Sequence, residues 1–194
     1  METYDQSRIG KLISWTSEHS VYHYGEQEVI KFSRFEILFG KRIVGRIERD
    51  LRVTKEFLGP YVLETRTEQS PSGTRVALIQ PFVRGEYLRR SHMRDPGVAE
   101  QFADIAERHT RLIAAHYAAV DFLGQGGCFS RCLSNIWVID ERDLKIIDTM
   151  LADPSNLGFM TPILRPITKI VLARQRGIVD EFLCAGRDLH PRRA

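Results

Sequence analysis

Two oxygen-bearing side chains late in the chain have the type and spacing of metal ligands. Asn135 opens a short apolar strand at 136–139, and Asp148 ends a second apolar stretch at 144–147. The polar residues 140–143 between them favour a turn, so the two strands are expected to form a hairpin. That geometry places an amide oxygen beside a carboxylate, and hard oxygen ligands of this kind suit Mg²⁺. The sequence therefore predicts a magnesium site held by Asn135 and Asp148.

Two charged side chains earlier in the chain could serve a phosphate group. Lys31 lies in an apolar strand at 29–32, whose neighbours would fix the direction of its ammonium group. Glu48 follows 17 residues later in a helical segment and could form an ion pair with Lys31. Taken alone, each is more simply a solvated surface charge. Their order together with Asn135 and Asp148 favours a phosphoryl-transfer site, which needs a cation, its anchor and metal ligands.

The elements that position these residues follow from the spacing of apolar side chains and from turn residues. In chain order we predict strands at 12–15, 20–24 and 29–32, a helix over 35–58 ended by Gly59 and Pro60, a hairpin over 61–67 and 74–82, a helix over 98–119, the Asn135 hairpin, and a helix over 163–182. A β-rich first half followed by a helical second half predicts an α+β fold.

Composition narrows the class of protein. The 194 residues carry a formal net charge of +3 and 43% hydrophobic residues, which is ordinary for a soluble globular domain and gives no indication of nucleic-acid binding. Three cysteines suit a reducing compartment, and the polar first residues are unlike a signal peptide. No apolar run approaches the length of a transmembrane helix. We therefore expect a cytoplasmic location.

The last helix and the residues after it are basic. From residue 158 onward there are seven Lys or Arg residues against three Asp or Glu residues. The apolar stripe of the helix, formed by Ile167, Ile170, Val171 and Ile178, is expected to pack on the rest of the protein. The exposed basic residues would then form either a solvated face or a peripheral contact with an anionic membrane or an acidic partner.

The order of these motifs resembles the protein-kinase-like superfamily over roughly residues 12–148. The strand around Lys31 resembles the one that carries the phosphate-contacting lysine, and Glu48 resembles its pairing glutamate. Gln80 and Phe82 stand where the hinge between the lobes contacts adenine. Residues 85–88, Gly-Glu-Tyr-Leu, resemble the start of the lower lobe in small bacterial kinase-like proteins.

Within that superfamily the chain is most similar to small bacterial proteins near the lipopolysaccharide kinases, the YrbL-type PhoP-regulated proteins and the toluene-tolerance proteins. The resemblance implies a two-lobed kinase-like fold with a truncated helical lower lobe. It implies a single domain over 1–194, with an N-lobe at 12–83 and a C-lobe at 84–194. It also implies ATP and Mg²⁺ as cofactors, bound between the lobes.

The sequence departs from the kinase pattern at several points. Ser130 lies five residues before Asn135, where the related enzymes carry their catalytic aspartate. The segment 16–19 has no glycine, so a Gly-rich phosphate loop is missing, and Thr149 and Met150 replace the usual Phe-Gly after the metal aspartate. Asp121 could substitute as a base, although an aspartate that turns the chain after a helix is the simpler interpretation.

Two functional hypotheses remain open from the sequence. One is a low-turnover phosphotransferase acting on a lipopolysaccharide sugar or another small envelope-related hydroxyl, with Glu48 holding Lys31 and Ser130 as a weak positioning group. The alternative is a pseudokinase, a nucleotide-responsive binding module for a regulatory protein partner. The retained metal and phosphate ligands favour the first, and Ser130 and the missing glycine loop favour the second.

Overall fold

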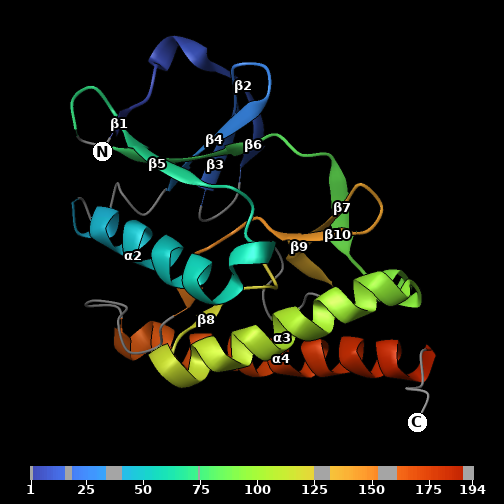
Figure 1. The fold of residues 1–194 in the computed structure, drawn as a ribbon. Helices are drawn as coiled ribbons and strands as arrows, with labels where there is room; N and C mark the ends of the chain where they lie inside the picture. Colours follow the sequence, from blue (N-terminus) through green and yellow to red (C-terminus); the bar gives the residue numbers. More distant parts are fainter. Residues whose placement is uncertain are drawn as a thin grey trace. The chain divides into compact units, whose positions relative to one another are not determined.

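The computed structural model describes residues 2–15, 19–33, 41–73, 75–124, 132–152 and 161–189; the side chains of 41–44, 161–164 and 188–189 lie outside the description (Figure 1). In chain order the elements are β1 Glu2–Thr3, η1 Gln6–Arg8, β2 Ile9–Trp15, β3 His19–Tyr24, β4 Glu28–Ser33, α2 Lys41–Leu58, η2 Gly59–Tyr61, β5 Arg66–Gln69, β6 Val76–Pro81, β7 Gly85–Leu88, η3 Arg90–Arg94, α3 Pro96–His116, β8 Ala119–Val120, β9 Leu133–Ile139, β10 Asp143–Ile146, β11 Leu151–Ala152 and α4 Thr161–Leu189. The predicted α+β class is confirmed.

The chain divides into two compact units. Unit 1 comprises residues 1–53 and 63–83, and unit 2 comprises residues 54–62 and 84–194. The main division falls between Val83 and Arg84, at the same place as the lobe boundary drawn from the sequence. That the two units make up one kinase-like domain stays a prediction.

Unit 1 is built on a six-stranded sheet in the order β1-β5-β6-β4-β3-β2. Five of the strands pair antiparallel, and three of them precede α2 while two follow it, as the resemblance implies. The sixth strand, β1, was not predicted. It adds to the edge of the sheet in parallel with β5, and the Tyr4 N–H continues the pairing by donating to the Gln69 carbonyl at 3.0 Å.

The two faces of this sheet are covered differently. On one face the buried Tyr4 packs with Tyr24, Ile30 and Ile79, and its ring lies edge-on to Phe32 at 5.6 Å. Tyr4, which belongs to a polar segment of the sequence, is therefore part of the core of unit 1.

The opposite face of the sheet is covered by the first part of α2. Ile47 and Leu51, four residues apart and so on one side of the helix, pack against Leu78 of β6. Lys31 lies directly opposite Leu78 in the β4–β6 register. Because directly opposed residues share a face, Lys31 is on the face that α2 covers.

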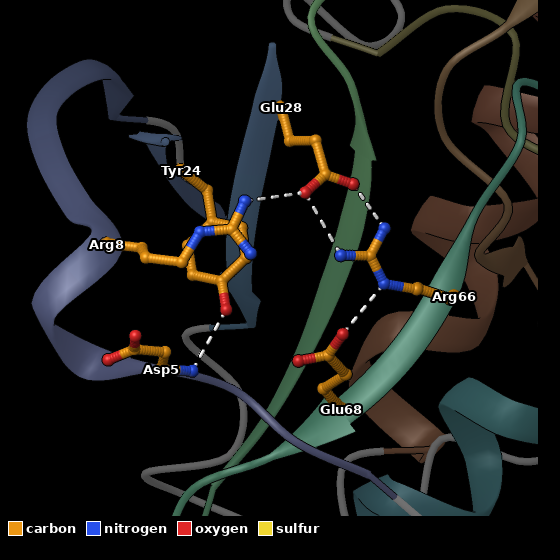
Figure 2. Close-up of polar contacts among 6 residues, drawn as sticks. All are labelled: Asp5, Arg8, Tyr24, Glu28, Arg66 and Glu68. Carbon is orange, nitrogen blue, oxygen red and sulfur yellow. Dashed lines mark hydrogen bonds and ion pairs between the residues drawn. The ribbon is translucent and has the colours of Figure 1, made fainter. Parts of the chain in front are cut away.

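A polar network ties the segment before β2 to this sheet (Figure 2). Its members are Asp5, Arg8, Tyr24, Glu28, Arg66 and Glu68. The Arg66 guanidinium contacts both oxygens of Glu28 and donates from Nε to Glu68 at 2.7 Å, and it lowers the pKa of Glu28 chiefly through its hydrogen bond. The Arg8 guanidinium lies 4.2 Å from the centre of the Tyr24 ring and also donates to Glu28 at 3.1 Å. The network joins η1, β3, β4 and β5.

Unit 2 contains the two long helices α3 and α4, which run side by side (Figure 1). α3 begins at Pro96 because Asp95 caps it, accepting from the N–H groups of Gly97 and Val98 at 2.8 and 3.2 Å. It ends at His116, earlier than predicted, since Tyr117 adopts a left-handed conformation with φ of 52°. The residues that follow enter β8 rather than extending the helix.

A three-stranded sheet in the order β10-β9-β7 completes the described part of unit 2, with the pair β11-β8. The hairpin of β9 and β10 confirms the Asn135 hairpin expected from the sequence, although β10 ends at Ile146. Strand β7 was not predicted as a strand. It pairs antiparallel with β9, and Gly85 lies so close to the Val138 carbonyl that a Cβ at this position would be 2.5 Å from the oxygen.

The helix predicted over 163–182 is α4, which continues to Leu189. The expectation that its whole apolar stripe is packed is wrong in its first half, where Ile167 and Ile170 are 53% and 60% exposed. Ile178 and Phe182, further along, are buried. Among the described residues, no helix combines the length and the apolar run needed to cross a bilayer.

Candidate functional site

The predicted metal ligands Asn135 and Asp148 are brought together within unit 2. Ile136 of β9 pairs with Ile146 of β10, and beyond the end of β10 the Ile147 N–H still donates to the Asn135 carbonyl at 3.0 Å. Asp148 therefore directly follows Ile147, the residue whose backbone is hydrogen-bonded to Asn135. The Asp148 carboxylate accepts the Met150 N–H at 3.1 Å, which turns the chain toward β11.

A third oxygen-bearing residue, Asp121, joins them. It directly follows β8, and β8 pairs antiparallel with β11 so that Val120 lies opposite Leu151. The antiparallel pairing carries the residue after β8 and the residues before β11 to the same end of the two strands. Asp121 and Asp148 are close enough to repel each other electrostatically.

The side chain of Asn135 has a fixed orientation. Its Nδ2 donates to the Asp121 carbonyl at 2.8 Å, and its backbone N–H donates to the Phe122 carbonyl at 3.2 Å. Because a carbonyl oxygen accepts only from the amide nitrogen, Oδ1 is the atom left to accept a donor or bind a cation.

Gly124 makes room for this amide. Its φ is +56°, and a Cβ at this position would lie 2.5 Å from both Asn135 Oδ1 and Ser134 Oγ. Real Cβ atoms do not approach other heavy atoms this closely, so a side chain at residue 124 would displace the proposed ligand. The left-handed conformation also favours glycine, since other residues are strained there.

The Asp121 carboxylate has a raised pKa. Burial is the largest cause, and the negative charge of Asp148 adds to it, while hydrogen bonds from the Leu123 and Gly124 N–H groups work in the opposite direction. Those N–H groups donate to Oδ1 at 2.9 and 3.3 Å. The turn-forming role expected of Asp121 is thus present, and the same side chain is also part of the carboxylate pair.

The backbone around Asp121 is held by Gln175 of α4, whose side chain is 2% exposed. Its Oε1 accepts the Phe122 N–H and its Nε2 donates to the Val120 carbonyl, both at 2.8 Å. These are the residues directly before and after Asp121. A single amide therefore fixes the backbone on both sides of the carboxylate.

His109 of α3 packs beneath the same segment. Its ring centre lies 4.4 Å from that of Phe122, and the ring is hydrogen-bonded to the Val120 backbone. Among the described residues Nε2 has no hydrogen-bond partner. Burial of the imidazole lowers the pKa of His109 to about 4.

This arrangement fits a magnesium ion. A carboxylate and an amide oxygen are hard ligands, and Mg²⁺ commonly binds few protein groups while keeping water and phosphate oxygens in its shell. A cation would also remove the repulsion between Asp121 and Asp148 that contributes to the raised pKa of Asp121. In the described part of the chain no three His, Cys, Asp or Glu residues group as metal ligands, and the protein donors would be Asn135 and Asp148, with the Asp121 carboxylate beside them.

The other predicted site residues lie apart from this group in the chain. Lys31 is on the α2 side of the sheet of unit 1, and Glu48 is exposed on α2, at the margin of the packed side formed by Ile47 and Leu51. The buried acid of this helix is instead Asp50, 1% exposed, which accepts from the guanidinium of Arg49 at 2.9 Å. The pairing of Glu48 with Lys31 stays a prediction.

The predicted adenine contacts lie at the end of β6. Gln80 is buried, and its Nε2 donates to the Thr65 hydroxyl at 2.8 Å. Its side chain therefore forms a hydrogen bond inside unit 1. The Phe82 ring is partly exposed and lies 5.3 Å from His23, while the Phe82 N–H donates to the Gln27 carbonyl at 2.7 Å. Ser130, predicted at the position of the base, lies outside the described residues.

Aromatic residues that sequence reasoning missed stand beside Asn135. Trp137 is two residues further along β9, and residues two apart in a strand share a face. Tyr87 of β7 lies directly opposite Trp137, with the ring centres 5.6 Å apart in an edge-to-face arrangement. Tyr87 is 39% exposed and Trp137 half-buried, so this face offers aromatic surface next to the predicted metal ligand Asn135. The sequence feature that could have revealed this face is Trp137, an aromatic residue two positions after Asn135 in the same strand.

Comparison with known proteins adds little to this description. No family profile and no curated protein matches the chain. Among solved structures, the kinase domain of Mycobacterium tuberculosis PknI is similar at 12% identity and a TM-score of 0.46, over 73% of this chain. The chain spans 58% of the length of that domain. At this level of similarity the description of the fold rests on the strands and helices themselves.

Proposed function

We propose that the chain is a kinase-like protein that binds ATP with Mg²⁺ and transfers phosphate, as an atypical phosphotransferase, to a small or envelope-related hydroxyl. The observation that carries the proposal is the group formed by Asp121, Asn135 and Asp148 in unit 2. The sequence resemblance to small bacterial proteins near the lipopolysaccharide kinases supports the class of substrate.

The residues have distinct roles in this proposal. Asn135 and Asp148 hold Mg²⁺, which neutralises charge on the phosphates when bound. Lys31 contacts the phosphates, and Trp137 offers an aromatic face for the nucleotide base.

Asp121 is proposed as the group that accepts the proton of the substrate hydroxyl. Ser130 is a poor base, and a positioned general base typically contributes about 10²–10⁴-fold to the rate. A carboxylate with a raised pKa is better suited to this step than an ordinary surface aspartate, because its proton affinity is closer to that required near neutral pH. The position of Asp121 beside Asn135 and Asp148 therefore supports a transferase over a binding module.

The alternative is a pseudokinase that binds nucleotide and signals to a protein partner. Ser130 and the absence of glycine at 16–19 favour it. The Phe82 N–H, a candidate adenine donor, is already engaged by the Gln27 carbonyl, which also favours an altered nucleotide site.

A thermal-shift titration with ATP and Mg²⁺, each alone and both together, tests the binding step. Ligand at 100 times its dissociation constant should raise the free energy of unfolding by about 2.7 kcal/mol. Asp148→Ala should remove the metal-dependent part of this gain. Asp143→Ala is the matched control, because Asp143 is an exposed aspartate in the same hairpin. An unchanged shift in Asp148→Ala would place any nucleotide elsewhere.

Turnover separates the two functions. Asp121→Asn keeps an oxygen for the Leu123 and Gly124 N–H groups, so the turn should survive while the base is lost. A transferase should lose about 10²–10⁴-fold in rate with its nucleotide affinity little changed. Nucleotide binding without phosphate transfer in the unaltered protein would identify the pseudokinase, and activity gained by Ser130→Asp would show that the rest of the site is assembled.

A further inference from the structure

Helix α4 has two halves with different surroundings. In its second half, Ile178 and Phe182 are buried, and the Phe182 ring lies 5.6 Å from Phe102 of α3. In its first half, Ile167 and Ile170 are 53% and 60% exposed. Residues three apart lie on the same side of a helix, so these two side chains form one exposed apolar strip.

The same half of the helix is uniformly basic. Residues 154–179 contain four basic residues and no acidic residue, and the first acid is Asp180. Arg165, Lys169 and Arg176 are exposed, and Arg174 is half-buried. A helix face that is merely solvated usually carries charges of both signs. Here, apolar side chains and charges of one sign share the exposed half of the helix.

We propose that the first half of α4 binds an anionic lipid surface. A helix that lies in the plane of a membrane interface needs exposed apolar side chains to enter the headgroup region and flanking Lys or Arg residues to meet the anionic headgroups. Ile167 and Ile170 meet the first need. Arg174, four residues after Ile170, lies on the same side of the helix, and Lys169 lies at the margin of that side, whereas Arg165 lies on the opposite side. The proposal is independent of the nucleotide site, since it uses none of the residues of that site.

Flotation of the full chain with vesicles tests this inference. Vesicles of 70% phosphatidylcholine and 30% phosphatidylglycerol should bind the protein at low salt, and pure phosphatidylcholine vesicles should not. Raising the salt to about 0.5 M should release the protein, because charges beyond a few ångströms are then screened. Replacing Lys169 and Arg174 by Gln should weaken partitioning about fivefold for each charge.

The apolar strip is tested separately. The double variant I167Q/I170Q should weaken partitioning at least about tenfold with no change in net charge, since it removes the groups that enter the interface. Both side chains are exposed, so its melting temperature should stay within about 2 °C of the unaltered protein.

Two matched controls accompany these variants. Arg89→Gln with Arg111→Gln changes the net charge equally at side chains that are 62% and 59% exposed on other elements. Leu12→Gln with Ile13→Gln removes exposed apolar surface from β2. Neither control should change partitioning by more than about twofold.

Several results would overturn the proposal. Equal binding to neutral and anionic vesicles would do so, as would an equal loss in either control. Binding to polyglutamate but not to vesicles would assign the surface to an acidic protein instead. A change from dimer to monomer on I167Q/I170Q, with no vesicle binding in the unaltered protein, would assign the strip to self-association.

Discussion

Lowering the pH should destabilise the protein through His109. The imidazole has a pKa of about 4 in the folded protein, against 6.5 as the ordinary value. Between these values the unfolded chain binds a proton at this residue and the folded protein does not. Stability therefore falls as the pH falls from 6.5 to 4, and the loss is complete below pH 4.

The magnitude follows from the size of this interval. Each pKa unit corresponds to about 1.36 kcal/mol, so the loss is about 2 kcal/mol by pH 5 and about 3 kcal/mol in full. His109 is buried, so solvent does not screen the effect appreciably.

Urea unfolding of the unaltered protein and of His109→Leu at pH 7.5, 6, 5 and 4.5 measures the effect. The variant lacks the titrating imidazole and serves as the reference. The free energy of unfolding of the variant, relative to that of the unaltered protein, should rise by about 2 kcal/mol between pH 7.5 and 5. Taking this difference cancels the titration of all other groups. His116→Leu, at an exposed histidine in the same helix, controls for the substitution itself. A His109→Leu difference that is independent of pH would refute the reasoning.

Three further predictions concern other parts of the structure. Gly124→Ala should cost at least about 1–2 kcal/mol and weaken metal-dependent nucleotide binding, whereas Gly177→Ala, at a helical glycine with open space around it, should stabilise by about 0.5–1 kcal/mol in the same urea assay. Gln175→Leu should cost about 1–3 kcal/mol, since it leaves the buried Phe122 N–H without its partner and removes one of the two hydrogen bonds to the Val120 carbonyl. A loss below about 0.5 kcal/mol, as at a surface position, would contradict the role of Gln175 in holding this backbone. Arg66→Met should cost about 1 kcal/mol at pH 7 and less below pH 3, since the lowered pKa of Glu28 contributes stability only while its carboxylate is ionised; an equal loss at both pH values in urea unfolding would argue against the ion pair.

The strands of unit 1 were predictable where the pattern is local. β3 and β4 lie within a residue of their predicted bounds, because β-branched and aromatic residues are bounded there by clear turn residues. β1 was missed because it is short and polar, and its partner β5 lies far along the chain. The burial of Tyr4 depends on that distant pairing, which no local pattern reveals.

The candidate site was predictable in part for the same reason. Asn135 and Asp148 belong to one hairpin, so their neighbourhood follows from local sequence. Asp121 joins them through the pairing of β8 with β11 and through hydrogen bonds from Asn135 to the Asp121 and Phe122 carbonyls. The two strands have two residues each and carry almost no sequence signal. Its turn-forming hydrogen bonds, which were foreseeable, gave no indication that the carboxylate also faces Asp148.

The parallel pairing of β1 with β5 has a consequence for synthesis on the ribosome. β1 is made before its partner, and at about 5–20 residues per second several seconds pass before Gln69 has been added to the chain. During this interval Tyr4 has no completed sheet to pack on, and β1 has no partner strand. β1 can therefore complete its native contacts only after β5, a strand made much later than β1, has joined the sheet.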